Sequence, residues 1–110
     1  MDIEVSKQGK WTVVSVGGRL DTTSAPEFDL RVKDLIAQGE CFLALDFRKL
    51  DYISSAGLRS VVVAGKTAKG KGGDAACCEP IGVVKKVFEI SGLGSIVPLF
   101  DSVDDAVGRP

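Results

Sequence analysis

Cys41-Phe42-Leu43-Ala44-Leu45 is a short apolar run without the alternation expected of a strand that has one face in water. A run of this kind after a helical stretch is typical of a central strand covered on both faces. Ala75-Ala76-Cys77-Cys78 is a second such run, and it also follows a helical stretch. Strands that alternate with helices predict an α/β fold, in which helices cover a largely parallel or mixed sheet.

Apolar residues at helical spacing predict helices between and after these runs. The expected helices span about residues 24–38, 57–69 and 81–90, and a fourth follows Ser102. Ser24 and Glu27 have the spacing of a capping box, while Gly39 and Gly92 are expected to end the first and third helices. The residues expected to face the core are Ala25, Phe28, Val32, Leu35 and Ile36, then Leu58, Val61, Val62 and Gly65, then Ile81, Val84, Val87 and Phe88.

The first 20 residues are expected to form two strands that meet at a turn at Gln8-Gly9. The second strand, Trp11 to Val16, is rich in β-branched and aromatic residues, and Gly17-Gly18 is expected to end it. Residues 96–99 predict a short strand, and Pro98 favours an edge position for it because proline lacks a backbone N–H. Residues 48–51 are expected to be a loop. The whole chain, 1–110, is therefore expected to be one domain with a central mixed sheet of about four to five strands and four helices.

The composition is that of a globular protein with balanced charge. Fourteen Lys and Arg against fifteen Asp and Glu give a net charge of −1, which is unlike the basic footprint of a nucleic-acid binder. The start of the chain lacks the pattern of a signal peptide, and no apolar run approaches the ~20 residues that span a bilayer. We expect a cytoplasmic protein with no direct nucleic-acid or membrane partner.

Catalytic and metal-binding patterns are missing from the sequence. There is no histidine, which removes the commonest general base and the Ser–His and Cys–His pairs. The three cysteines lack metal-ligand spacing and are expected to be reduced, buried thiols. Gly65-Lys66-Thr67 is similar to the end of a P-loop, but the glycine required five residues earlier is Ser60. We therefore expect neither an enzyme nor a bound cofactor.

The stretch Tyr52-Ile53-Ser54-Ser55-Ala56-Gly57-Leu58-Arg59 places two hydroxyl side chains between an apolar strand and an amphipathic helix. Serine at a helix start often serves only as an N-cap, because its oxygen accepts a hydrogen bond from a free backbone N–H. From the residues alone, capping and a functional hydroxyl both remain open.

The same stretch resembles the D-S-S-G-L signature of STAS domains of the anti-sigma-factor-antagonist type. Two further motifs of that family have counterparts here in the same order. Gly18-Arg19-Leu20-Asp21 is similar to its G-x-L-D turn, and Ser91-Gly92-Leu93 is similar to its late S-G-L segment. The resemblance covers essentially the whole chain and implies the STAS arrangement of a sheet with helices packed on it.

The resemblance implies a switch that acts by binding. Such proteins bind an anti-sigma factor, usually a serine kinase, and so free a sigma factor. Phosphorylation of one serine ends the binding, and a serine phosphatase restores it. Alignment on Gly57-Leu58 places the acceptor at Ser55, with Ser54 at the usual aspartate position and as the alternative acceptor. Asp21 is expected to lie nearby, and the implied partner surface consists of Asp21, Ser54, Ser55, Ala56, Gly57 and Leu58.

Other interpretations remain. One is a STAS scaffold in a stress-signalling or transporter-associated complex, which would co-purify with those proteins. Another is a small nucleotide-binding or hydrolysing protein, which the failed P-loop disfavours. The sequence also leaves a homodimer open.

Overall fold

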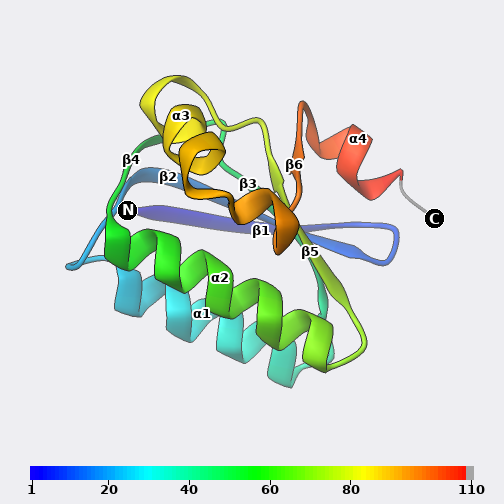
Figure 1. Cartoon of the computed structure of the whole chain (residues 1–110). Coiled ribbons are helices and arrows are strands. Elements are labelled where there is room, and N and C mark those ends of the chain that lie inside the picture. Colours follow the sequence, from blue (N-terminus) through cyan, green and yellow to red (C-terminus); the bar gives the residue numbers. More distant parts are fainter. Residues whose placement is uncertain (109–110) are drawn as a thin grey trace.

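A computed structural model describes residues 1–108 as a twisted mixed sheet with helices packed on it (Figure 1). The strands are β1 (Asp2–Gln8), β2 (Trp11–Leu20), β3 (Phe42–Asp46), β4 (Leu50–Ile53), β5 (Asp74–Cys78) and β6 (Leu99–Phe100). The helices are α1 (Ala25–Ala37), α2 (Ser55–Gly70), α3 (Gly82–Ser91) and α4 (Val103–Val107), with a 3-10 turn at Leu93–Ser95. The predicted α/β class with a mixed sheet is confirmed.

The sheet has the order β1-β2-β3-β5-β6, and β4 also pairs with β2. Among the described strands, only the β1–β2 pair is antiparallel; the other pairs are parallel. The apolar runs that become β3 and β5 lie in the middle of the sheet, as predicted. The parallel pairing places the carboxyl ends of β2 and β4 at the same end of the sheet, where α2 begins.

Strand β2 is longer than its sequence predicts. Residues 12–15 pair with β3 and residues 18–20 pair with β4, with an irregularity between Gly18 and Arg19. Gly18 therefore does not end the strand: it has φ +86°, and its N–H donates to the Lys49 carbonyl at 3.0 Å. The predicted loop over 48–51 is likewise wrong in part, because β4 starts at Leu50 beside this second half of β2.

Two apolar cores lie on opposite faces of the sheet. The larger core packs α1, α2 and α3 against one face, with Phe28, Val61 and Phe88 among its fully buried side chains. The smaller core packs Ala106 of α4 against Trp11 and its neighbours on the other face. Most of the buried surface therefore fixes the helices on the α2 side of the sheet.

The structure differs from two local predictions and confirms a third. The strand expected over 96–99 is shifted, because residues 93–95 form a 3-10 turn and pairing starts only at Leu99; its edge position is correct. Ile81 does not face the core but is 52% exposed, because it precedes the first turn of α3. Ser102 caps α4 as expected, with its side chain accepting from the Asp105 N–H at 3.0 Å.

Candidate functional site

Helix α2 starts at Ser55, two residues before the predicted Gly57, and Ser54 is its N-cap. The Ser54 side chain accepts a hydrogen bond from the Gly57 N–H at 3.2 Å, which satisfies one of the free donors of the first turn. The Ser54 backbone N–H donates to the carbonyl of Leu20 at 3.0 Å. Ser54 therefore joins the start of α2 to the end of β2, and its hydroxyl is occupied by capping.

Ser55 is the first residue of α2 and is exposed. In the part of the chain that the structure describes, its hydroxyl has no hydrogen-bond partner, and the first turn of α2 has no acidic residue. A helix N-terminus favours negative charge, because its free N–H groups carry the positive end of the helix dipole. An anionic group attached to Ser55 would thus meet a favourable local field and no competing carboxylate in that turn.

Gly57 fixes how closely α2 approaches the sheet. A Cβ at this position would collide with the Leu20 carbonyl oxygen and would lie 2.8 Å from Cγ1 of Ile53. Gly57 itself is buried and offers a partner no side chain. Among the other residues of the expected partner surface, Ala56 is half-buried and Leu58 packs partly against the larger core.

Asp21 follows β2 directly and closes the turn that leads into α1. Its Oδ1 accepts from the N–H groups of Thr23 and Ser24, both at 3.1 Å, and its Oδ2 lies 3.5 Å from Nε of Arg19. These contacts, chiefly the N–H of Ser24, lower the pKa of the Asp21 carboxyl below its ordinary value of 3.8. The structure therefore gives Asp21 a definite role in the turn.

The capping box expected between Ser24 and Glu27 is not formed. Ser24 precedes α1, but its side chain makes no capping hydrogen bond. Its hydroxyl instead donates to the carbonyl of Arg19 at 2.7 Å and accepts from the Asp21 N–H at 2.9 Å. The Asp21 turn thus uses the hydroxyl that the sequence pattern assigned to the helix.

Strand pairing brings the Asp21 turn and the start of α2 to the same end of the sheet. Leu20 and Ile53 are direct neighbours on β2 and β4, and Asp21 and Ser54 are the residues that follow them. The Arg19 guanidinium lies 4.1 Å from the centre of the Tyr52 ring, which adds a second link between the two strands. No sequence pattern indicates this Arg19–Tyr52 pair, because it depends on the register of β2 against β4.

The two buried cysteines do not supply a reactive thiolate. Cys77 and Cys78 are free and buried, as predicted, whereas Cys41 is partly exposed. Burial raises the pKa of Cys78 to about 12 and that of Cys77 well above the usual value, so neither thiol is a reactive thiolate at neutral pH. Across residues 1–108, no group of three His, Cys, Asp or Glu could hold a metal ion, and no helix is long and apolar enough to cross a membrane.

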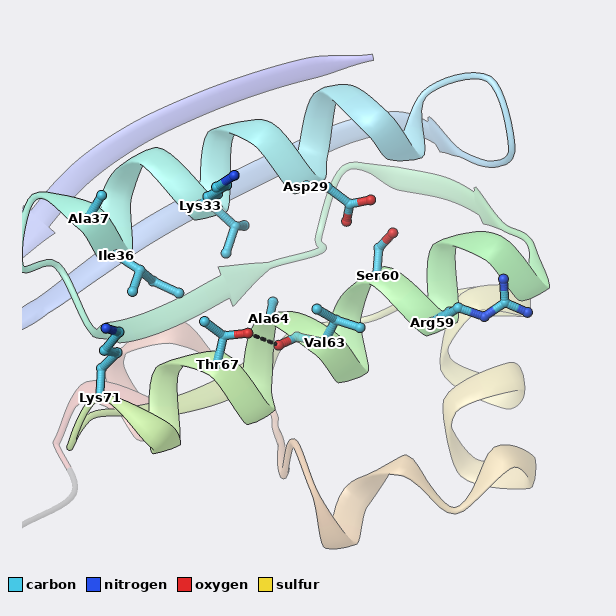
Figure 2. Close-up of a pocket in the computed structure, with 11 residues that line it drawn as sticks. Asp29, Lys33, Ile36, Ala37, Arg59, Ser60, Val63, Ala64, Thr67 and Lys71 are labelled. Atoms are coloured by element: carbon cyan, nitrogen blue, oxygen red, sulfur yellow. Dashed lines mark hydrogen bonds between the residues drawn. The ribbon is translucent and has the colours of Figure 1, made fainter.

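A groove of about 570 Å³ lies between α1 and α2, starting one turn along α2 from Ser55 (Figure 2). Asp29 and Ser60 lie at one end of the groove and Lys71 at the other, as Figure 2 shows. The side chains that line it are Asp29, Val32, Lys33, Ile36, Ala37, Arg59, Ser60, Val63, Ala64, Thr67 and Lys71. The sequence alone does not predict this groove, because it depends on how α1 and α2 lie side by side.

Comparison with known proteins shows the family to which this fold belongs. The family model of the STAS domain matches residues 2–106. The chain belongs to the STAS domain family. STAS domains of the anti-sigma-factor-antagonist type are regulatory binding proteins, not enzymes, and the sequence comparisons place the chain among them.

Two further comparisons agree with this membership. BtrV of Bordetella bronchiseptica, which carries the name of an anti-sigma factor antagonist, is 33% identical over 106 residues, covering 96% of this chain and 91% of that protein. A crystal structure of a Thermotoga maritima protein with the same description superposes with a TM-score of 0.89 at 22% identity, covering 96% of this chain and 91% of that one.

The phosphorylated form of the Bacillus cell fate determinant SpoIIAA has the same fold. It superposes with a TM-score of 0.73 at 21% identity, covering 98% of each chain. At this identity the likeness concerns the fold alone.

Proposed function

We propose that this STAS domain binds an anti-sigma factor of the serine-kinase type, and that phosphorylation of Ser55 ends the binding. Binding would release a sigma factor in the cytoplasm, and a serine phosphatase would restore the unphosphorylated form. The observation that carries the proposal is the pair of adjacent serines at the start of α2. Ser54 is occupied as the cap, whereas the Ser55 hydroxyl is exposed.

The relatives support the choice of partner. BtrV matches nearly the full chain at 33% identity and is named for antagonism of an anti-sigma factor. SpoIIAA, which has the same fold, is known in a phosphorylated form. The assignment of the acceptor to Ser55 is supported by the match of Gly57-Leu58 to the family signature and by the exposure of the hydroxyl.

The switch follows from charge. A phosphoserine adds about −1.5 to −2 charges at neutral pH and moves the net charge from −1 to about −3. At Ser55 the new charge lies at the start of α2, where the helix dipole favours it by roughly 0.3–1 kcal/mol at an exposed site. The domain itself therefore has no reason to unfold when it is phosphorylated.

A partner that covers the start of α2 meets the opposite balance. It must desolvate the phosphate or supply positive charge and space for it, and burying an unpaired charge is costly. Asp21, Ala56 and Leu58, which lie at the same end of the sheet or in the same turn, would belong to the covered surface. Phosphorylation thus separates the complex while the domain keeps its fold.

The partner can be identified by a pull-down from cells with the wild-type chain beside Ser55→Ala. The retained anti-sigma factor is then titrated calorimetrically against wild type, Ser55→Ala, Ser55→Asp and Ser54→Ala. We expect Ser55→Asp to bind at least tenfold more weakly, which is about 1.4 kcal/mol, with a thermal midpoint close to that of wild type. Ser55→Ala should bind and should no longer be phosphorylated.

Three results would contradict the proposal. Tight binding by both Ser55→Asp and the phosphorylated chain would place the switch elsewhere. Phosphorylation that persists in Ser55→Ala and disappears in Ser54→Ala would move the acceptor to Ser54. Retention of a stress-signalling or transport protein in place of an anti-sigma factor would favour the scaffold interpretation.

A further inference from the structure

The groove between α1 and α2 has the features of a surface that receives a helix. Its walls are largely apolar, formed by Val32, Ile36, Val63 and Ala64 from the two helices. Val63 lies in the middle of α2 and is 53% exposed. An apolar side chain of a partner can pack against this partly exposed valine and its apolar neighbours, and burying their apolar surface is favourable.

The charges around the groove differ in sign from those of the chain as a whole. Arg59, Lys33 and Lys71 against Asp29 give a local net charge of 3 − 1 = +2, whereas the chain carries −1. Helix α2 itself contains cations at positions 59, 66 and 69 and no acidic residue. A segment that complements this surface must therefore be acidic as well as apolar.

The dimensions fit a short helix. Arg59 in α2 and Lys71 at its C-cap bound the groove, and these positions, 12 residues apart, are separated by about 18 Å of helix. A helix of about 12 residues in the partner would span that length. Helices that bind in grooves place apolar residues at i, i+3, i+4 and i+7 toward the groove and keep polar residues at its edges.

The distribution of charge favours a helix over a small amphiphilic anion. Arg59 also borders the groove, at the same end as Asp29 and Ser60, so cations are present at both ends of it. An anion with one charged end would pair with the cations at one end of the groove and would leave those at the other end beside an apolar tail (Figure 2). A helix with acidic residues along its polar edge can meet the cations at both ends.

We infer that the α1–α2 groove binds an acidic amphipathic helix of the anti-sigma factor. This inference rests on the proposed function and extends its surface away from the phosphorylation site. Ser55 and Arg59 are one helical turn apart on α2, so the groove and the acceptor form one continuous surface. Binding in the groove would supply affinity, and the state of Ser55 would decide whether the partner can approach.

The test compares two exposed valines. Val63→Asp places a carboxylate in the groove, and Val83→Asp places one on α3, where Val83 is 61% exposed and outside the groove. Both side chains are exposed, so both variants should keep the wild-type thermal midpoint within a few degrees. We expect Val63→Asp to weaken binding of the anti-sigma factor at least tenfold, and Val83→Asp to stay within about threefold of wild type.

A second pair of variants tests the charge. Lys33→Glu/Lys71→Glu reverses two cations of the groove, and Lys66→Glu reverses a neighbouring cation on α2 that does not line it. We expect the double variant to bind more weakly and to lose the salt dependence of the association rate, while Lys66→Glu changes both only slightly. Hydrogen exchange of the anti-sigma factor should show one newly protected amphipathic stretch of about 12 residues.

The outcomes separate this inference from the proposed function. If wild type does not bind the anti-sigma factor, the proposed function and the groove inference both fail. If wild type binds and Ser55→Asp does not, but Val63→Asp binds like wild type, the groove inference alone is wrong. A loss of binding in Val83→Asp but not in Val63→Asp would assign the contact to α3. A change in self-association in Val63→Asp would instead assign the groove to a second copy of the chain.

Discussion

The two faces of α2 differ in the size of their side chains and in how far these are exposed to solvent. The buried face, toward the sheet and α1, has small residues and one valine, namely Gly57, Ser60, Val61, Ala64, Gly65 and Ala68. The face toward solvent has the exposed residues Ser55, Arg59, Val63, Lys66 and Thr67. A Cβ at Gly65 would lie 2.6 Å from Cγ2 of Val97, so the buried face at Gly65, as at Gly57, has no spare room.

This difference explains how one helix can serve both fold and function. The buried face fixes the depth and the start of α2 against β2 and β4, and so fixes where Ser55 lies. The outer face makes few contacts within the domain, so its side chains are available for modification and for a partner. Substitutions on the buried face should therefore change stability, and substitutions on the outer face should change binding.

The largest effect is expected at Gly57. Gly57→Ala brings a methyl group against the backbone oxygen of Leu20, which cannot move without disturbing strand pairing. We expect a loss of about 3 kcal/mol in the free energy of unfolding, measured by urea denaturation. Gly70→Ala is the matched control on the same helix, because nothing lies within 4 Å of its added Cβ.

Gly70→Ala should be neutral or stabilising by up to about 1 kcal/mol, since alanine lowers the entropy of the unfolded chain and has the higher helix propensity. Equal effects of the two substitutions would mean that the close approach of α2 to Leu20 does not limit the position of the helix.

The second effect compares two valines on opposite faces. Val61 is fully buried in the larger core, whereas Val63 is 53% exposed. Val61→Ala removes two buried methyl groups and leaves a cavity, so it should lower the free energy of unfolding by about 2 kcal/mol. Val63→Ala should stay within about 0.5 kcal/mol of wild type in the same urea denaturation. Similar losses would show that Val63 supports the fold as well, which would weaken the separation of the two faces.

The neighbouring serines give the next effect. Ser54→Ala removes the cap that accepts from the Gly57 N–H, and we expect a loss of about 1 kcal/mol in stability. Ser55→Ala removes a hydroxyl without a partner among the described residues and should change stability by less than about 0.5 kcal/mol. Thermal and urea unfolding of both variants measure this contrast. A reversal, with Ser55→Ala the more damaging variant, would mean that Ser55 is the structural serine.

The sequence predicts the elements that depend on local pattern and misses those that depend on pairing. The apolar runs of β3 and β5 and the periodicity of α1 and α2 are enough to identify these four elements. Strand β4 has Leu50 and Ile53 buried but Asp51 and Tyr52 exposed, so it lacks a strand period. It forms because the second half of β2 offers it a partner, which no local pattern contains.

The candidate site is likewise predicted only in part from the sequence. The stretch 52–59 marks the start of α2 from composition and from its resemblance to a family signature. Either serine could cap a helix, and the choice depends on a helix boundary that pattern alone gives only to within a few residues. Ser24 illustrates the same limit. Ser24 and Glu27 have the spacing of a capping box, but the Ser24 hydroxyl forms its hydrogen bonds with the Asp21 N–H and the Arg19 carbonyl.

The smallest effect concerns the pH dependence of the turn between β2 and α1, which Asp21 holds. Hydrogen bonds from Thr23 and Ser24 lower the pKa of Asp21 in the folded chain, and the unfolded chain lacks them. A carboxyl with a lowered folded pKa stabilises the fold above its unfolded pKa and loses that contribution as pH falls through the folded value. The stability difference between wild type and Asp21→Asn should therefore be constant above about pH 5 and should shrink as the pH falls below 3.8, the ordinary value.

Glu40 is the matched control for this measurement. Its pKa is also lowered, chiefly by a hydrogen bond from Lys7, and so it titrates in the same acidic range. Because its contact ties β1 to the segment before β3, far along the chain from the start of α2, Glu40→Gln should leave the pH dependence due to Asp21 intact. Urea unfolding of both single variants and the double variant from pH 7 to about pH 3 measures the two contributions separately. An Asp21→Asn difference that does not change with pH would mean that the Asp21 carboxylate does not hold this turn. The turn between β2 and α1 would then be held by the Ser24 hydroxyl, which donates to the Arg19 carbonyl and accepts from the Asp21 N–H.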